Sequence, residues 1–145
     1  MKTVLAGQHL VSPYCLVSLT PHGDERGKLI SIESFRNISF GIKRFYYIYD
    51  TDPDWVRGKH AHSNLEQLVI AIDGACRFVL DTGKVREDIW LNRPNIALYI
   101  GKYVWREMHD FSYGCKLLVL ASEYYQPEEY IRTYDNFIQL AKEQK

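Results

Sequence analysis

The chain has 145 residues, of which 46% are hydrophobic and 25% charged. These values are typical of a folded globular domain and argue against a disordered chain or a membrane protein. Eighteen basic residues balance eighteen acidic ones without any basic run, which argues against nucleic acid as a partner. We therefore expect one domain over residues 1–145 with its own hydrophobic core.

The N-terminus and the cysteines predict the cellular location. The N-terminal stretch of residues 1–8 is too short, and becomes polar too soon, to form a signal peptide. Cys15, Cys76 and Cys115 lack the spacing of a metal site, and their odd number suits reduced, buried thiols. The sequence therefore indicates a cytoplasmic protein.

Short β-strands dominate the predicted secondary structure. Runs rich in β-branched and aromatic residues are bounded by turn residues along most of the chain. The predicted strands cover residues 15–19, 28–33, 43–49, 68–72, 76–80, 85–91, 96–100, 104–108 and 115–121. So many closely spaced strands with no helix between them predict an all-β fold, either a jelly-roll barrel or a sandwich.

Two turn sequences predict how three of these strands connect. Asp73-Gly74 tolerates the positive φ angles of a type I′ turn, which favours a tight hairpin. Asp81-Thr82-Gly83 repeats the pattern one strand later. We therefore expect residues 68–91 to form an antiparallel meander.

Only the C-terminus has a helical pattern. Pro127, Glu128 and Glu129 are residue types favoured in a first helical turn. Apolar residues then recur at spacings of three and four up to Ala141. The sequence predicts a short C-terminal helix that begins at Pro127.

The segment around His60-Ala61-His62 carries the strongest functional signal. In an extended strand these two imidazoles share one face, and Asn64 and Glu66 join them if the strand runs straight on. Over residues 43–49 the same alternation places Arg44 and Tyr46 on one face. Two readings remain open, a metal site and a metal-free acid/base site.

A jelly roll with His-x-His on an inward strand resembles the cupin superfamily. His60, His62 and Glu66 match the core of the first cupin metal motif. The second motif lacks its histidine shortly after Gly101, and His109 comes too late in the sequence. A metal-dependent cupin enzyme, either a dioxygenase or a sugar isomerase, that uses these three residues remains an alternative.

Longer segments resemble the nucleotide-sugar 3,4-ketoisomerases. The matching segments are residues 42–49, 57–62, 65–67, 104–108, 120–125 and 130–132. The resemblance implies a cupin that needs neither metal nor another cofactor and acts on dTDP-4-keto-6-deoxy-D-glucose. Such an enzyme moves the ketone from C4 to C3, and its product supplies the biosynthesis of a 3-acetamido-3,6-dideoxyhexose for surface glycans.

The resemblance also implies residue roles. His60 is expected to be the base, and His62 to move protons between O3 and O4. Arg44, Arg57 or Tyr46 is expected to hold the developing oxyanion or the pyrophosphate. Trp105 is expected either to stack on thymine or to lie in the core.

Two further positions distinguish members of the family. Members with a galacto product have an arginine where this chain has Arg26 and a histidine in the position of Arg106. Members with a gluco product match Arg106 but have tyrosine at the other position, so the C4 configuration stays open.

The resemblance implies a homodimer, often with exchanged N-terminal strands. A non-catalytic sugar-nucleotide binding module is the third hypothesis.

Overall fold

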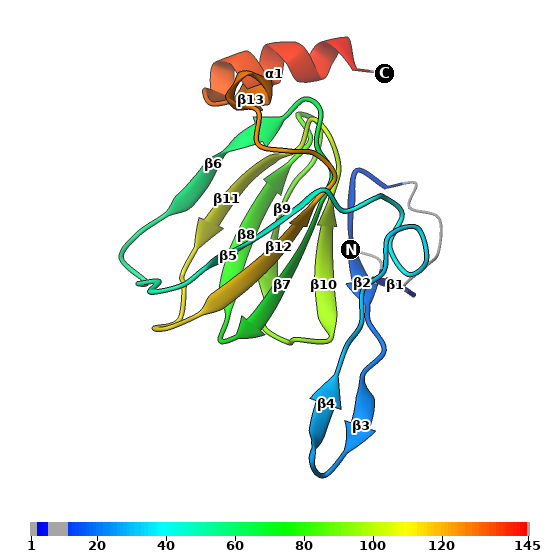
Figure 1. Ribbon diagram of the computed structural model, residues 1–145. Coiled ribbons are helices and arrows are strands. Elements are labelled where there is room, and N and C mark those ends of the chain that lie inside the picture. Colours follow the sequence, from blue (N-terminus) through cyan, green and yellow to red (C-terminus); the bar gives the residue numbers. More distant parts are fainter. Residues whose placement is uncertain (1–2, 6–11, 145) are drawn as a thin grey trace.

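Two β-sheets pack face to face in the computed structural model, which describes residues 3–5 and 12–144 (Figure 1). Residues 1–2 and 6–8, most of the segment whose sequence argues against a signal peptide, lie outside the described residues. The strands are joined mainly by loops, and one helix lies across one end of the two sheets. The architecture confirms the predicted all-β, cupin-type jelly roll, as a sandwich whose sheets do not close into a barrel.

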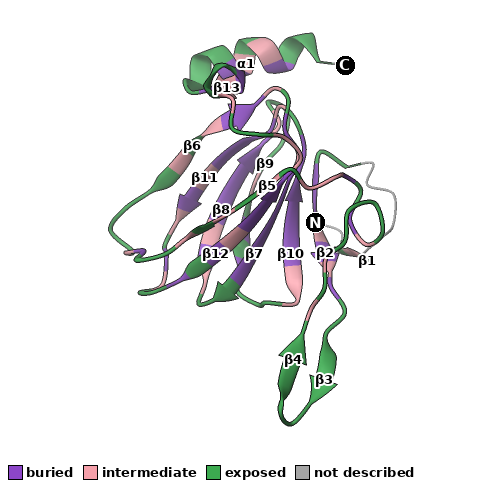
Figure 2. Ribbon diagram, viewed as in Figure 1, coloured by how far each residue is buried: buried purple, intermediate pink, exposed green. Residues whose placement is uncertain are grey.

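The first sheet has six strands, and its central strand is buried. Its order is β1 (Thr3–Leu5), β2 (Tyr14–Ser18), β10 (Ile96–Ile100), β7 (Gln67–Asp73), β12 (Lys116–Ala121) and β5 (Arg44–Ile48). In β7 all five residues from Gln67 to Ala71 are buried, because both faces of this strand are covered. Figure 2 shows the same burial along the neighbouring central strands.

The second sheet has five strands and carries the histidines. Its order is β13 (Tyr130–Ile131), β6 (Arg57–His62), β11 (Trp105–His109), β8 (Cys76–Asp81) and β9 (Arg86–Leu91). The main core lies between the two sheets and includes Val69, Phe78, Leu98 and Leu117. His60 borders this core, because it lines a small cavity together with Val69 and Phe78.

The predicted meander over residues 68–91 is only half right. The hairpin of β8 and β9 is confirmed, since these strands pair antiparallel from Cys76 to Asp81. However, β7 pairs with β10 and β12, so Asp73-Gly74 carries the chain from one sheet to the other. Gly74 has a φ of 74°, and the next amide, that of Ala75, donates to Ser112 Oγ. Both edges of β7 are already paired, with β10 and β12, so no edge is left for β8.

The strand predicted at residues 28–33 is wrong in extent. It ends at Leu29, because β4 (Gly27–Leu29) pairs only with β3 (His22–Asp24) in a separate hairpin. The following apolar residues, among them Ile30, Ile32 and Phe40, pack on the outer face of the six-stranded sheet without joining it. The β3–β4 hairpin is exposed along its whole length and projects away from the sandwich (Figures 1 and 2).

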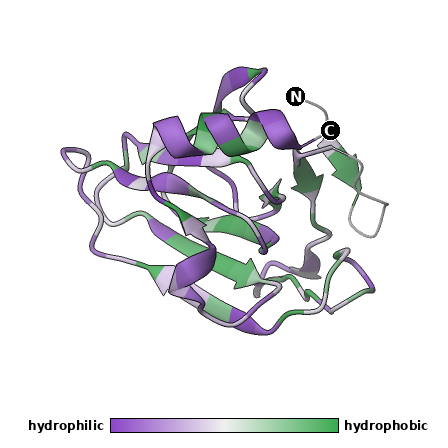
Figure 3. Ribbon diagram, turned by 90° about the horizontal axis from the view of Figure 1, so that it is seen from above, coloured by the Kyte–Doolittle hydropathy of each residue, from purple (hydrophilic) through white to green (hydrophobic). Residues whose placement is uncertain are grey.

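The C-terminal helix begins later than predicted. Pro127–Glu129 forms a separate 3₁₀ turn, η1, and the chain then pairs with β6 through β13. Helix α1 (Tyr134–Glu143) starts after the Thr133 cap, whose side chain accepts a hydrogen bond from the Asn136 amide. Seen from above, α1 lies across the end of the sandwich (Figure 3). The two extended residues of β13 thus lie between Glu129 and helix α1.

The cysteines agree with the prediction. Cys15, Cys76 and Cys115 are all unpaired and buried. Burial raises the pKa of each thiol. Within residues 3–5 and 12–144, no helix is both long and apolar enough to cross a membrane.

A β-bulge in β6 decides which side chains share the histidine face. His60 lies opposite Arg106 and Arg57 lies opposite Met108, so β6 uses one residue more than β11 between these pairs. Gly58 and Lys59 take up this residue with φ angles of 83° and 55°. In a straight strand Arg57 and His60 would lie on opposite faces. The bulge places them on the same face.

We expect Gly58→Ala to destabilise the protein more than Gly114→Ala. Both glycines have positive φ angles, so each substitution costs about 1 kcal/mol of backbone strain. A Cβ at Gly58 would also lie 3.1 Å from the Arg106 carbonyl oxygen, whereas one at Gly114 meets nothing within 4 Å. Urea denaturation should show about 1 kcal/mol of additional loss for Gly58→Ala. Equal losses would contradict this account of the bulge.

Candidate active site

The two histidines lie side by side on β6, as the sequence predicts. Their Nε2 atoms are 3.1 Å apart, and the rings meet edge to face with centroids 4.8 Å apart. The His62 side chain is completely buried, whereas His60 is partly exposed and lines a small cavity between the sheets. His60 is therefore the imidazole that a ligand can reach.

Glu129 closes the other side of His62. His62 Nδ1 is hydrogen-bonded to Glu129 Oε1 at 2.5 Å, and the Asn64 amide donates to Glu129 Oε2 at 3.2 Å. The amide of Ser63 donates to the backbone carbonyl of Glu129 at 3.0 Å. This carboxylate is 7% exposed and is held in place because η1 leads directly into β13.

Arg106 brings a buried positive charge to the same face. It lies opposite His60 on β11 and is 2% exposed. Its Nη1 donates to Gln67 Oε1 and its Nη2 to the Val104 carbonyl at 2.9 Å, while Gln67 Nε2 donates to the Tyr46 hydroxyl at 3.1 Å. The guanidinium is therefore fixed, and through Gln67 it also fixes Tyr46.

Arg44 is the side chain with unused donors. It comes from the same face of β5 as Tyr46, and its guanidinium packs against the rings of Tyr46 and Tyr125 at 5.4 and 5.6 Å. Its Nε and Nη2 are buried, and neither has a hydrogen-bond partner among the described residues. Buried donors of this kind are costly unless a ligand satisfies them. An oxyanion is the complementary ligand.

Tyr130 and Arg132 complete the wall beside the histidines. The Tyr130 ring contacts the rings of His62 and His60, with centroids 4.4 and 5.2 Å apart. The Arg132 guanidinium lies 4.4 Å from the Tyr130 ring centroid. These residues, with Gln67 and Glu129, were not predicted as site residues. The clue available in the sequence was the family-like segment 130–132.

The electrostatics keep both imidazoles neutral at pH 7. Burial and then the charge of Arg106 lower the pKa of His60 to about 4 from the ordinary 6.5. The same two causes lower the pKa of His62 still further. Burial also lowers the pKa of Arg106 to about 10, which leaves it protonated at pH 7. The site thus combines neutral bases with fixed cations, which suits proton abstraction next to a developing oxyanion.

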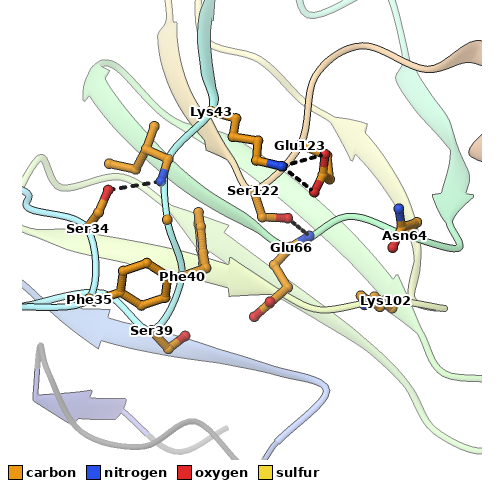
Figure 4. A pocket seen from close by; sticks show the side chains of 12 residues that line it. Ser34, Phe35, Ser39, Phe40, Lys43, Asn64, Glu66, Lys102, Ser122 and Glu123 are labelled. Atoms are coloured by element: carbon orange, nitrogen blue, oxygen red, sulfur yellow. Dashed lines mark hydrogen bonds and ion pairs between the residues drawn. The ribbon is translucent and has the colours of Figure 1, made fainter.

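The cavity beside His60 is small, about 20 Å³, enough for about one water molecule. A larger hollow of about 600 Å³ lies elsewhere, lined by the 34–43 segment and by loop residues just before β7, just after β12 and after β10 (Figure 4). Its carboxylates already have partners, since Glu66 accepts from Tyr99 and Glu123 pairs with Lys43. It contains no histidine. We therefore place the candidate active site at the histidine face despite its smaller volume.

The predicted metal ligands are not brought together. Strand β6 ends at His62, so Asn64 and Glu66 do not continue its face as expected. The Glu66 carboxylate accepts from the Tyr99 hydroxyl at 2.6 Å. Among the described residues, no group of three or more His, Cys, Asp and Glu side chains is arranged to hold a metal ion. The ligand set of His60, His62 and Glu66 therefore does not fit a metal here.

The structure separates the remaining predicted residues. Arg57 lies at the exposed end of the histidine face. Trp105 instead points to the opposite face of β11, where its buried ring packs 5.4 Å from Tyr134 beneath α1. Of its two expected places, this position matches the core. Arg26 lies in the exposed β3–β4 hairpin and pairs with Asp24 at 2.8 Å, so one chain alone does not bring it to the histidines.

Known proteins share both the sequence and the fold. The family model described as "FdtA: WxcM-like, C-terminal" matches residues 13–142. The TDP-4-oxo-6-deoxy-α-D-glucose-3,4-oxoisomerase of Aneurinibacillus thermoaerophilus is 52% identical over 79% of this chain and 82% of its own length.

Two solved structures support the same relationship. A 3,4-ketoisomerase from Helicobacter canadensis is 53% identical, with a TM-score of 0.87 over 89% of this chain and 97% of that one. A histidine-to-asparagine variant of the 3,4-ketoisomerase QdtA from Thermoanaerobacterium thermosaccharolyticum, in complex with TDP-4-keto-6-deoxyglucose, is 43% identical, with a TM-score of 0.89 over 93% and 98% of the two chains. This chain therefore belongs to the FdtA family of sugar 3,4-ketoisomerases.

Proposed function

We propose that this enzyme converts dTDP-4-keto-6-deoxy-D-glucose into a dTDP-3-keto-6-deoxyhexose. The observation that carries the proposal is the neutral, cavity-facing imidazole of His60 beside the fixed guanidinium of Arg106. The names of the relatives, and the keto sugar bound to one of them, support the same substrate. The product would supply the biosynthesis of a 3-acetamido-3,6-dideoxyhexose for surface glycans.

The reaction needs one base and stabilised oxyanions. His60 takes the proton from C3, the electrons form a C3–C4 double bond, and O4 becomes negative. The O3 proton then passes to O4, His60 gives its proton to solvent, and the C3 carbonyl forms as C4 takes up a proton that comes from solvent. Atoms and charge balance without an external oxidant, because the ketone only changes position.

The cations have separate parts in this proposal. The unpartnered Nε and Nη2 of Arg44 would bind an oxygen of the developing enediolate or of the diphosphate. Arg57, at the exposed end of the same face, would bind the diphosphate. Tyr46, held by Gln67, would donate its hydroxyl proton in a hydrogen bond to O3 or O4. The buried Arg106 would stabilise the enediolate through its charge.

We further propose that one domain over residues 1–145 works as a cytoplasmic homodimer. The three unpaired cysteines suit a reducing compartment. The β3–β4 hairpin is exposed on all sides, and an isolated two-stranded hairpin is marginally stable. Docking of this hairpin on a second copy would stabilise it and would bring Arg26 to the partner's histidines.

The reaction itself is tested by proton NMR in D₂O. With dTDP-4-keto-6-deoxyglucose and chelator-treated protein, we expect a 3-keto product that carries deuterium at C4. His60→Asn should lose at least about 100-fold in turnover, because it removes the base. Its circular dichroism should match the wild type. An unchanged spectrum with wild-type protein, or full activity of His60→Asn, would overturn the proposal.

The protonation of the base is tested by an NMR titration of His60. We expect its pKa near 4 in the wild type. A neighbouring cation favours the neutral imidazole, so Arg106→Met should raise this pKa towards 6.5. Arg86→Met is the matched control, because Arg86 pairs with Asp81 and Glu107 away from the histidines. A pKa that stays the same in Arg106→Met would contradict the electrostatic account.

The exchanged hairpin is tested by mixing two variants. His60→Asn lacks the base but keeps Arg26, whereas Arg26→Ala keeps the base. If the hairpin reaches the partner's site, refolding the two together restores about one quarter of wild-type activity, through one complete site in each mixed dimer. If Arg26→Ala alone is fully active, or if mixing restores nothing, the exchange proposal is wrong. Light scattering gives the oligomeric state independently.

A further inference from the structure

Three side chains form a continuous hydrogen-bonded series from the interior to the cavity. Glu129 Oε1 is hydrogen-bonded to His62 Nδ1, and His62 Nε2 lies 3.1 Å from His60 Nε2. Both ring nitrogens of His62 are therefore occupied, and the ring has no exposed surface. In this arrangement His62 acts on a substrate through His60, and not by direct contact with O3 and O4.

We infer that Glu129 is a positioning residue that fixes the tautomer of His62 and thereby stabilises the proton that His60 takes from the substrate. The inference deepens the proposed function and rests on it. Glu129 itself lies two side chains away from the cavity, so it contacts no reacting atom. Its effect must pass through the two imidazoles.

The hydrogen bonds around Glu129 determine which nitrogen of His62 carries the hydrogen. The Asn64 amide can only donate, and it occupies Oε2. Burial raises the pKa of the Glu129 carboxyl, whereas the backbone hydrogen bonds of Asn64 and Ser63 and the charges of Arg106 and Arg44 lower it, and we take Glu129 as ionised at pH 7. Oε1 then accepts from His62 Nδ1–H, which leaves the lone pair of His62 Nε2 directed at His60. Once His60 is protonated, its Nε2–H can donate to this lone pair. The opposite tautomer would place two N–H groups against each other.

The surrounding charges make a carboxylate necessary at this place. Arg106 from β11, Arg44 from β5 and Arg132 after β13 all disfavour a positive charge on His62, and Arg106 and Arg132 also disfavour it on His60. Tyr130 and Tyr46 also face the site, and burial raises the pKa of Tyr46, which keeps its hydroxyl neutral at pH 7. Glu129 is the negative group bonded to the series, and it offsets the cations when His60 becomes an imidazolium.

Glu129→Gln separates this role from simple packing. Glutamine has nearly the same shape but only one acceptor oxygen, whereas two donors meet the carboxylate, His62 Nδ1–H and the Asn64 amide. If the oxygen turns to Asn64, the amide NH₂ meets His62 Nδ1 and favours the tautomer with hydrogen on Nε2. When His60 becomes an imidazolium, that hydrogen would lie against the Nε2–H of His60. If the oxygen stays with His62, the negative charge is still lost.

The experiment measures turnover of dTDP-4-keto-6-deoxyglucose and the ¹⁵N shifts of His62 in the same proteins. We expect Glu129→Gln to lower kcat on the order of 100-fold with KM within about twofold, since only the proton transfer is affected. The ¹⁵N shifts should change from the Nδ1–H form of the wild type. Glu129→Asp should recover part of kcat. Glu128→Gln, an exposed neighbour in the same turn, should match the wild type.

Three results would overturn the inference. One is wild-type kcat in Glu129→Gln, the second is a loss confined to KM, and the third is a wild-type His62 with hydrogen on Nε2. The third needs no variant, so it decides the question even if Glu129→Gln fails to fold. If the wild-type protein itself does not turn over the sugar, the proposed function fails, while the ¹⁵N shifts still report on the tautomer.

Discussion

The contact between Glu129 and His62 is the interaction on which the rest of the site depends. Both groups are almost fully buried, so each would be costly without the other. Removing one partner of a buried hydrogen bond typically costs about 1–3 kcal/mol, because the other group is left unsatisfied. The contact holds η1 and β13 against the edge of β6. The geometry of His60 follows, because its ring rests on that of His62.

Each of the two sheets supplies a different set of side chains to the site. The five-stranded sheet provides the imidazoles and Arg106, whereas the six-stranded sheet provides Tyr46, Gln67 and Arg44. Gln67 links the halves, since its amide accepts from Arg106 and donates to Tyr46. A polar network of this kind is stable between two sheets only when each buried member has a partner. The two unpartnered nitrogens of Arg44 are therefore the natural place for a ligand oxygen.

Sequence reasoning succeeded where the physical rule is local. Alternation along a strand correctly placed His60 with His62 and Arg44 with Tyr46, because side chains alternate with period two in any strand. It failed for Glu129, which has the residue type and position of a first helical turn. The chain instead inserts β13 before α1, because pairing with β6 satisfies the backbone of residues 130–131. Nothing in the local sequence indicates that distant partner.

By itself the sequence determined the strand content, the histidine face and the family, since these follow from residue type, spacing and long matching segments. Only the tertiary structure decided which strands are neighbours, that Trp105 is a core residue, and that Glu66 turns away from the histidines towards Tyr99. The physical reason is that strand pairing and burial depend on residues far apart in the chain. A single bulge at Gly58 reverses the face of Arg57, and no local pattern predicts it.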